Sequence, residues 1–223
     1  MAMIVTTKDT TALSDAELVE MADLCVDREP NFDIGFLSKQ REEWVLVTHV
    51  REGSKLRGYS FCTLERIGGT PALLIGLLLV DRNAKADQTL RAILHDQFRR
   101  ALLAFPDEDV LLGARLSSPD GFRAFAGLED IVPRKGYKPT GEDRAWGRRL
   151  AKRFGAEKAI DDHTFVMTVP SSPVGCLDYV AAKGAIPDGA EEFFAELCPE
   201  DGQRLIAFGW AMAESLASGK LPR

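Results

Sequence analysis

The stretch Ala72-Leu-Leu-Ile-Gly-Leu-Leu-Leu-Val80 decides which fold we expect for this chain. Every residue in it is apolar, and polar residues follow at once, beginning with Asp81 and Arg82. The run has only about half the length that a membrane-spanning helix needs. A short run that is apolar on both faces is typical of a strand in the middle of a sheet, covered on both sides by other elements.

Two strand-like stretches come before this run and complete an antiparallel meander. Residues 44–50 and 56–66 are rich in β-branched, aromatic and aliphatic side chains. Two turn-like segments, residues 51–55 and 67–70, separate the three stretches and contain glycine. Apolar stretches joined by such turns predict antiparallel strands that are neighbours in one sheet.

A helix and a further strand follow the meander. After a polar loop, apolar residues recur at helical spacing, namely Leu90, Ile93, Leu94, Phe98, Ala101, Leu102 and Phe105. Residues 110–116 are again apolar and predict a strand. Because a strand, a helix and a strand in succession normally form a right-handed parallel crossover, the sheet should be antiparallel first and parallel later.

The first part of the chain predicts a strand and two helices. Residues 4–7 are β-prone, and Ser14 and Glu17 form the capping-box pattern that is typical of a helix start. This helix should end before Pro30, and a weaker helix should cover residues 36–43. The apolar residues of the first helix recur at helical spacing, at Leu18, Met21, Ala22 and Cys25.

Elements after residue 116 extend the same domain. Ser118 and Pro119 predict a helix start, and residues 142–154 predict a helix that stops at Gly155. Two strands are expected at residues 164–169 and 204–210, and a helix at residues 189–197. We therefore expect one α/β domain over residues 1–223, with a mixed sheet of about six to seven strands flanked by helices. Residues 170–223 should be a largely helical C-terminal extension that packs on the core.

Composition limits the classes of protein to which the chain can belong. It is 45% hydrophobic and 28% charged, which favours a packed globular protein. Its net charge of −6 argues against nucleic acid or an anionic membrane as the main partner. The four cysteines form no C-x-x-C pair and no histidine lies at metal-ligand spacing, so we expect no metal site. No signal-peptide pattern opens the chain, and we expect reduced thiols and a cytoplasmic location.

The predicted order of elements resembles the GNAT-type N-acyltransferase fold. In that family a loop of pattern Gln/Arg-x-x-Gly-x-Gly/Ala, at the start of the central helix, holds the pyrophosphate of acetyl-CoA between two strands whose ends diverge. Free backbone N–H groups and the positive end of the helix dipole attract the phosphates. The resemblance implies that acetyl-CoA is bound here by Val80, Arg82, Lys85, Ala86, Gln88, Thr89 and Leu90.

The loop departs from the family pattern at two positions. If Lys85 stands at the Gln/Arg position, Gln88 and Leu90 replace glycine-type residues, and Leu90 brings bulk near the expected phosphates. This degenerate loop is combined with segments at residues 115–122 and 191–197 that look similar to a group of bacterial GNAT-like proteins. The resemblance covers about residues 4–210 and names no substrate.

Catalytic residues are not evident in the sequence. The family typically uses a carboxylate base near the central strands, for which only Glu65 and Asp81 are in range, and each is more simply an exposed strand-end carboxylate. The family's acid tyrosine is also missing, because Ala151 stands at the matching position. Tyr137 follows Pro133 too closely to lie at the end of a helix.

Basic residues and histidines offer further candidates, each with a simpler interpretation. Arg144, Arg148 and Lys152 lie along one face of the predicted helix. This favours a solvated face balanced by the acidic stretch 188–201 over a docking site for CoA phosphates, an acidic partner or RNA. The three histidines are solitary in the sequence, at His49, His95 and His163.

Two functions remain open at this point. The first is an acyl-CoA-dependent N-acyltransferase that moves an acetyl or similar group to a small-molecule or protein amine. The second is a non-catalytic binding or interaction protein that retains the fold, which the lost glycines and the absent catalytic residues favour. Fold alone does not separate them.

Overall fold

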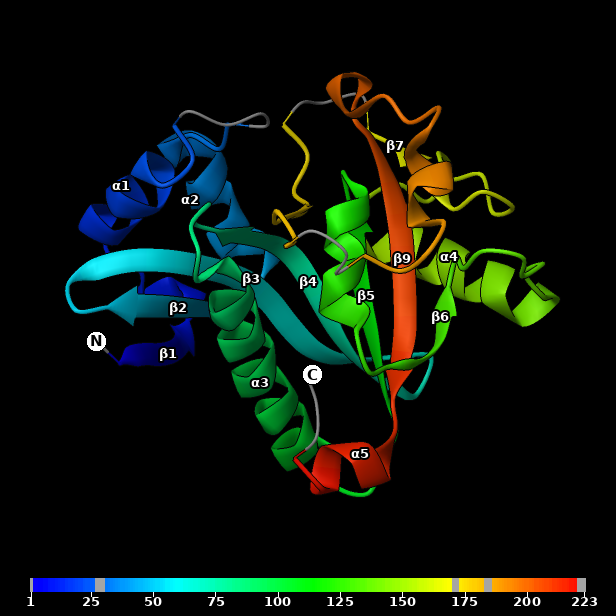
Figure 1. The fold of residues 1–223 in the computed structure, drawn as a ribbon, viewed down its shortest axis with the longest axis horizontal. Coiled ribbons are helices and arrows are strands. Elements are labelled where there is room, and N and C mark those ends of the chain that lie inside the picture. Colours follow the sequence, from blue (N-terminus) through cyan, green and yellow to red (C-terminus); the bar gives the residue numbers. More distant parts are fainter. Residues whose placement is uncertain (1, 27–30, 170–172, 183–185, 220–223) are drawn as a thin grey trace.

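The computed structural model describes residues 2–26, 31–169, 173–182 and 186–219, and these form a mixed sheet flanked by helices (Figure 1). In the described residues the sheet has nine strands in the order β1-β2-β3-β4-β8-β5-β9-β6, with β7 also paired to β9. The strands are β1 (Met3–Asp9), β2 (Leu46–Glu52), β3 (Lys55–Ile67), β4 (Thr70–Val80), β5 (Val110–Leu116), β6 (Glu129–Val132), β7 (Val166–Thr168), β8 (Leu177–Asp178) and β9 (Gln203–Ala211).

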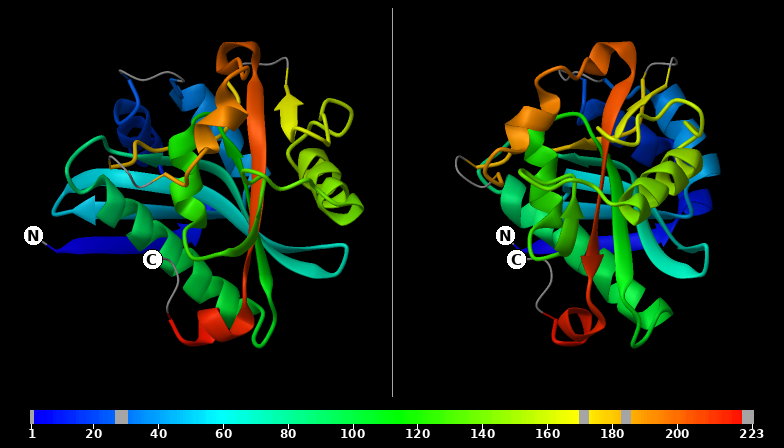
Figure 2. Two further views of the ribbon diagram at one scale, coloured as in Figure 1. Left: turned by 45° about the vertical axis from the view of Figure 1, so that its right-hand side comes forward. Right: turned by 90° about the vertical axis from the view of Figure 1, so that its right-hand side faces the viewer.

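Helices cover both faces of the sheet (Figure 2). Helix α3 (Ala86–Ala104) crosses one face, whereas α1 (Asp15–Asp23), α2 (Ile34–Glu43) and α4 (Gly141–Arg153) lie on the other. The short helix α5 (Ala213–Ala217) follows β9 and contacts α3. The described residues also contain four 3-10 helices, namely η1 (Thr10–Ala12), η2 (Pro119–Phe125), η3 (Ala190–Phe194) and η4 (Pro199–Asp201).

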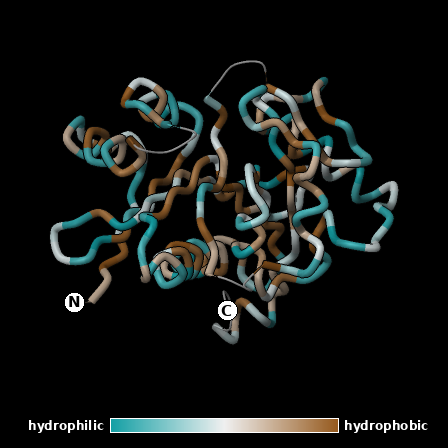
Figure 3. The backbone as a smooth tube through the Cα atoms, turned by 45° about the horizontal axis from the view of Figure 1, so that its top comes forward, coloured by the Kyte–Doolittle hydropathy of each residue, from teal (hydrophilic) through white to brown (hydrophobic). Residues whose placement is uncertain are grey.

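The predicted meander and crossover are both confirmed. Strands β2, β3 and β4 pair antiparallel, and β4 and β5 pair parallel from Ala72↔Leu111 to Ile75↔Ala114. Strand β4 is buried along its length from Pro71 to Val80, as expected of a central strand. Figure 3 shows the apolar residues concentrated in these central strands, with polar residues on the outer helix faces and loops.

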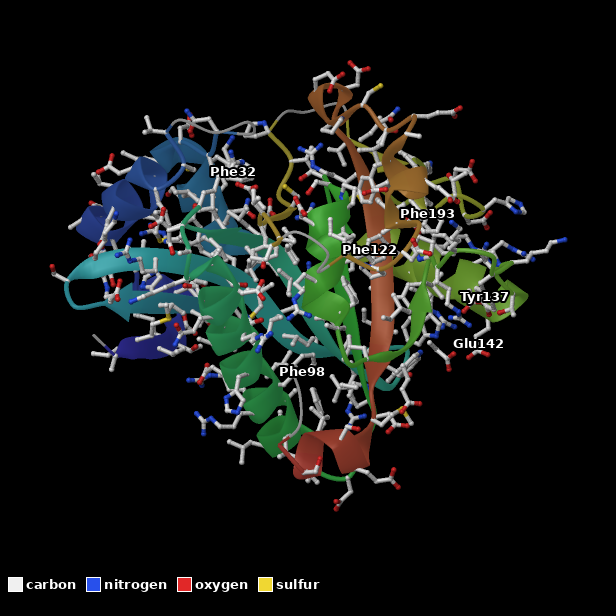
Figure 4. The ribbon with its side chains drawn as sticks, viewed as in Figure 1. Phe32, Phe98, Phe122, Tyr137, Glu142 and Phe193 are labelled. Atoms are coloured by element: carbon white, nitrogen blue, oxygen red, sulfur yellow. The ribbon has the colours of Figure 1, made fainter. Side chains whose placement is uncertain are left out.

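The sheet is larger than predicted, and two predicted helices are shorter. Strands β6 and β8 raise the count above six to seven, and the C-terminal part contributes strands β8 and β9 as well as the short helices η3, η4 and α5. The expected helices at Ser118 and at residues 189–197 are the 3-10 helices η2 and η3. Their side chains Phe122 and Phe193 pack together with ring centroids 6.1 Å apart (Figure 4). Pro30 and Pro170, which mark predicted boundaries, lie outside the described residues.

The first helix begins as its capping box predicted. The Ser14 hydroxyl accepts a hydrogen bond from the Glu17 amide at 3.3 Å, and the Glu17 carboxylate accepts one from the Ser14 amide at 2.9 Å. In the described part of the chain, no helix combines the length and the apolar character needed to cross a bilayer.

Candidate functional site

The gap between β4 and β5 is occupied by the chain itself. The two strands pair only as far as Ile75 and Ala114, and beyond that point β8 lies between them, parallel to both. The Leu78 amide donates to the Cys176 carbonyl at 3.0 Å. This gap is where the family resemblance places acetyl-CoA, so we call residues 174–179 the gap segment.

The gap segment is packed as tightly as the rest of the core. All of its side chains are buried, including Cys176, Leu177 and Tyr179. A Cβ atom added at Gly175 would lie 2.7 Å from the Gly76 carbonyl oxygen and 2.8 Å from Arg115 Nη2, so only glycine fits there. Burial also raises the pKa of the Cys176 thiol above its usual value.

Most of the residues predicted to hold acetyl-CoA do not face a common cavity. Four of them, Val80, Ala86, Thr89 and Leu90, have buried side chains, and Gln88 is exposed. We expected the bulk of Leu90 to lie near the phosphates of acetyl-CoA. Its side chain is instead buried in the core, so it does not obstruct the loop.

The two basic side chains of the predicted loop already have carboxylate neighbours. Lys85 pairs with Glu52, and Arg82 Nη2 lies 3.6 Å from Asp178 Oδ1. Asp87 stands in the first turn of α3 and accepts a hydrogen bond from the Tyr179 hydroxyl. Because a carboxylate already occupies this helix start, the positive end of the α3 dipole is partly neutralised before any phosphate arrives.

Two pockets flank the gap segment. The first, which we call the loop pocket, has a volume of about 430 Å³ and adjoins the start of α3. It contains Arg82 and Ala86 of the predicted cofactor residues and is lined by Arg82, Asn83, Ala84, Ala86, Asp87, Tyr179, Val180, Ala181 and Ala182.

The second pocket, the edge pocket, lies where β5 and β8 end, between η2 and η4. Its volume is about 590 Å³, and its lining residues are Arg82, Ser117, Ser118, Asp120, Asp178, Tyr179, Val180, Pro199, Glu200 and Arg204. Burial raises the pKa of Asp120 above its usual value, and the nearby charge of Asp178 adds to this, although the Ala181 amide opposes it. Asp120 is thus a half-buried carboxylate whose ionised form is disfavoured by burial and by the charge of Asp178.

Sequence reasoning missed the edge pocket. Ser118 and Pro119 signalled a helix start, but nothing in the local pattern set the adjacent Asp120 apart as a pocket residue. Asp178 and Arg204 come from distant parts of the chain, and only the pairing of β8 and β9 with β5 brings them to this edge.

The carboxylates considered as bases are engaged in ion pairs. Arg153 Nε donates to Glu65 at 2.7 Å, and Arg57 Nη1 donates to Asp81 at 2.9 Å. Hydrogen bonds from Arg57 and Asn83 lower the pKa of Asp81 against the opposing effect of burial, which is the largest single influence. A lowered pKa makes the Asp81 carboxylate a weaker proton acceptor than a free one.

The basic face of α4 is balanced locally. Arg148 pairs with Asp162, Lys152 Nζ lies 3.0 Å from Glu157 Oε1, and Arg144 donates to the Pro139 carbonyl. The partners of this face are therefore neighbours in sequence, not the acidic stretch 188–201 that we expected. From the wider basic region, Lys135 does pair with Glu192 of that stretch, at 2.9 Å.

The histidines and the possible metal-binding side chains were the remaining candidates for a functional site. His49 is buried beside Met21 and Glu17, with its ring 3.3 Å from the Met21 sulfur, and His163 is exposed. Within the residues that the structure describes, no group of three or more His, Cys, Asp or Glu side chains is arranged to hold a metal ion.

Comparisons with known proteins find similarity at the level of structure. No family model and no curated protein matches the chain. Among solved structures, it is similar to an aminoglycoside 6'-acetyltransferase type Ii, with 11% identity, 59% of this chain and 88% of that chain covered, and a TM-score of 0.41. The aminoglycoside 6'-N-acetyltransferase from Enterococcus faecium matches with 10% identity, 93% and 96% coverage and a TM-score of 0.42. An N-acetyltransferase from Staphylococcus aureus matches with 14% identity, 62% and 91% coverage and a TM-score of 0.39.

These matches are likenesses of structure at low sequence identity. The chain has a mixed α/β sheet flanked by helices, and the solved structures named above to which it is similar are acetyltransferases. Identities of 14% or less and TM-scores of 0.42 or less transfer no residue role and no substrate to this chain.

Proposed function

We propose that this chain is a ligand-binding protein on a GNAT-like fold, and that its own gap segment takes the place an acyl-CoA would need. The observation that carries the proposal is the position of β8 between β4 and β5. The ligand then enters from the edge pocket at the ends of these strands, not through the gap.

Displacing the gap segment is unfavourable. It would expose the side chains of Cys176, Leu177 and Tyr179, all buried, and break the hydrogen bond from the Leu78 amide. Each large apolar side chain stabilises the buried state by roughly 1.5–3 kcal/mol. An incoming acyl-CoA would have to offset this loss at a helix start that already carries Asp87.

Calorimetric titration with acetyl-CoA, combined with hydrogen exchange, tests the proposal. We expect no saturable heat at millimolar acetyl-CoA and unchanged protection of the Leu78 amide, because Cys176 keeps its hydrogen bond. Tight binding of acetyl-CoA, accompanied by faster exchange at Leu78 and in residues 174–179, would contradict it.

A second candidate is an acyl-CoA-dependent N-acyltransferase that acts on a small-molecule or protein amine. The loop pocket favours it, since this cavity adjoins the predicted cofactor residues Arg82 and Ala86. This function requires the gap segment to leave its place during turnover. Arg82→Ala should then weaken acetyl-CoA binding at low salt, whereas Arg99→Ala, on the exposed surface of α3, should leave it unchanged.

A further inference from the structure

We propose that the edge pocket binds a small zwitterion that carries a primary ammonium group and a carboxylate, as a free amino acid does. The inference rests on the proposed function, because it assigns the ligand class of the pocket named there. Three features of the pocket support it: its carboxylates, its arginines and its apolar lining residues.

The carboxylates make one part of the wall suitable for a cation. Asp120 is half-buried, Asp178 is buried at the end of β8, and Glu200 stands exposed on η4. Burial and the nearby charge of Asp178 raise the pKa of Asp120, against a hydrogen bond from the Ala181 amide and the charge of Arg82. An ammonium group placed between Asp120 and Asp178 would relieve the repulsion between them and supply hydrogen bonds to both.

The arginines of the pocket wall make it suitable for an oxyanion as well. Arg204 is only 2% exposed, and its guanidinium donates to the carbonyls of Pro199 at 2.8 Å and Gln203 at 2.6 Å. Within the described part of the chain it forms no ion pair, and its Nε has no hydrogen-bond partner. A buried guanidinium bonded only to carbonyls lacks the anion that normally compensates such a charge.

Arg82 adds a second guanidinium that can move towards a ligand. Its side chain is 48% exposed, and its contact with Asp178 is long at 3.6 Å. A ligand ammonium at Asp178 and a ligand carboxylate at Arg82 would replace this loose contact with two closer ones. Ser118 also lines the pocket, and a serine hydroxyl can donate to a carboxylate.

A ligand with a single charge would satisfy only half of this wall. The described lining residues carry three carboxylates and two guanidinium groups. An amine without a carboxylate would leave the charge of Arg204 uncompensated, and a carboxylic acid without an amine would be repelled by Asp120. The Tyr179 ring, Val180 and Pro199 add apolar surface for a side chain. A volume of about 590 Å³ accommodates an amino acid with room for a side chain.

The test uses the full chain and a set of matched ligands. Thermal shift with each of the standard amino acids selects the strongest binder, and calorimetry compares it with its methyl ester, which lacks the carboxylate, and its N-acetyl derivative, which lacks the ammonium. We expect saturable binding of the amino acid and a loss of about tenfold or more for each derivative. Equal binding of all three, or no binder in the set, would overturn the proposal.

Variants locate the binding. Asp120→Asn and Arg82→Gln should each weaken binding about tenfold or more, whereas Arg99→Gln, on the exposed surface of α3, should leave it unchanged. Unchanged affinity in both pocket variants would show that the ligand binds elsewhere and would reject the edge pocket. Should Asp120→Asn disturb folding, Arg82→Gln and Glu200→Gln still decide the matter, because both side chains are exposed.

The acetyl-CoA and amino-acid titrations together separate an error in the ligand class from an error in the proposed function. If acetyl-CoA does not bind and no amino acid binds, the ligand class is wrong while the closed gap stands. If acetyl-CoA binds and the gap segment loses its protection, the proposed function itself is wrong.

Discussion

Gly76 lies in β4, next to Trp44 at the end of α2 and next to Gly175 of the gap segment. Its carbonyl accepts a hydrogen bond from Arg115 Nη2 at 2.8 Å, and a Cβ atom there would lie only 1.8 Å from Trp44 Cε2. The register between β3 and β4 shifts at this point. Arg115 is buried beneath the ring of Phe154, 4.7 Å from its centroid, and close to the C-terminal ends of α2 and α4. The negative ends of these helix dipoles help to compensate its charge.

Gly76→Ala should therefore destabilise the protein by roughly 1–3 kcal/mol or more, because Trp44 must move away from the added methyl group. Chemical denaturation measures the change. Gly141→Ala is the matched control, since nothing lies within 4 Å of its Cβ position, and it should be nearly neutral. Equal stability of the two variants would show that Trp44 adapts freely.

His49 should make stability depend on pH. Burial lowers its pKa to about 4, with a smaller contribution from Arg51, while Glu17 opposes the shift. The unfolded chain binds a proton near pH 6.5, so this contribution is complete above that pH and is lost as pH falls towards 4. The loss is on the order of 3 kcal/mol. His49→Gln should weaken the dependence of the unfolding free energy on pH between 6.5 and 4. The matched control is His163→Gln, because the His163 side chain is exposed, and it should leave that dependence unchanged.

Among the elements, those with strong local signals were predictable. Strand β4 followed from its continuous apolar run, α1 from its capping box, and α4 from its helical spacing and the stop at Gly155. Strand β8 carries no such signal, because two residues show no period and its place depends on contacts with β4 and β5. Helix η2 was misjudged as an α-helix start, because the cap pattern of Ser118 and Pro119 does not fix how the turn continues.

The candidate site was predictable only in part, for the same reason. Arg82 and Ala86, two of the residues predicted to bind acetyl-CoA, line a pocket beside the gap. The other predicted residues face the core, solvent or an ion-pair partner. The edge pocket depends on how β8 and β9 pair with β5, and no local sequence pattern predicts that pairing.

Gly175→Ala should loosen β8 without unfolding the sheet. The added methyl group would lie 2.7 Å from the Gly76 carbonyl oxygen, so the gap segment must shift, while β4 and β5 keep their own pairing from Ala72 to Ile75. Exchange of the Leu78 amide should become about tenfold faster or more, since its partner Cys176 moves away. A Leu78 amide as protected as in the unchanged chain would show that the segment tolerates the methyl group. Gly141→Ala again serves as the control.

At the scale of the whole molecule, β9 joins β6 and β7 to the rest of the sheet through β5. It pairs with β5 from Val110↔Ala211 to Leu116↔Leu205 and carries β6 and β7 on its other side. The last fifty or so residues therefore supply interior structure, although they come last in sequence. This arrangement follows from the apolar stretch at residues 204–210, which is too hydrophobic to remain in water.

Removing everything after Pro170 should leave an insoluble or molten protein. The truncation exposes the β5 edge and deletes Leu205, Ile206 and Phe208, buried side chains that each contribute roughly 1.5–3 kcal/mol. Calorimetry and near-UV circular dichroism should show no cooperative transition and no fixed aromatic environment. A shorter truncation after Ala211 is the matched control. It removes α5 but keeps β9, so it should lower the melting temperature and leave unfolding cooperative. A cooperative melt of the longer truncation at the temperature of the intact chain would show that residues 1–170 fold without β9.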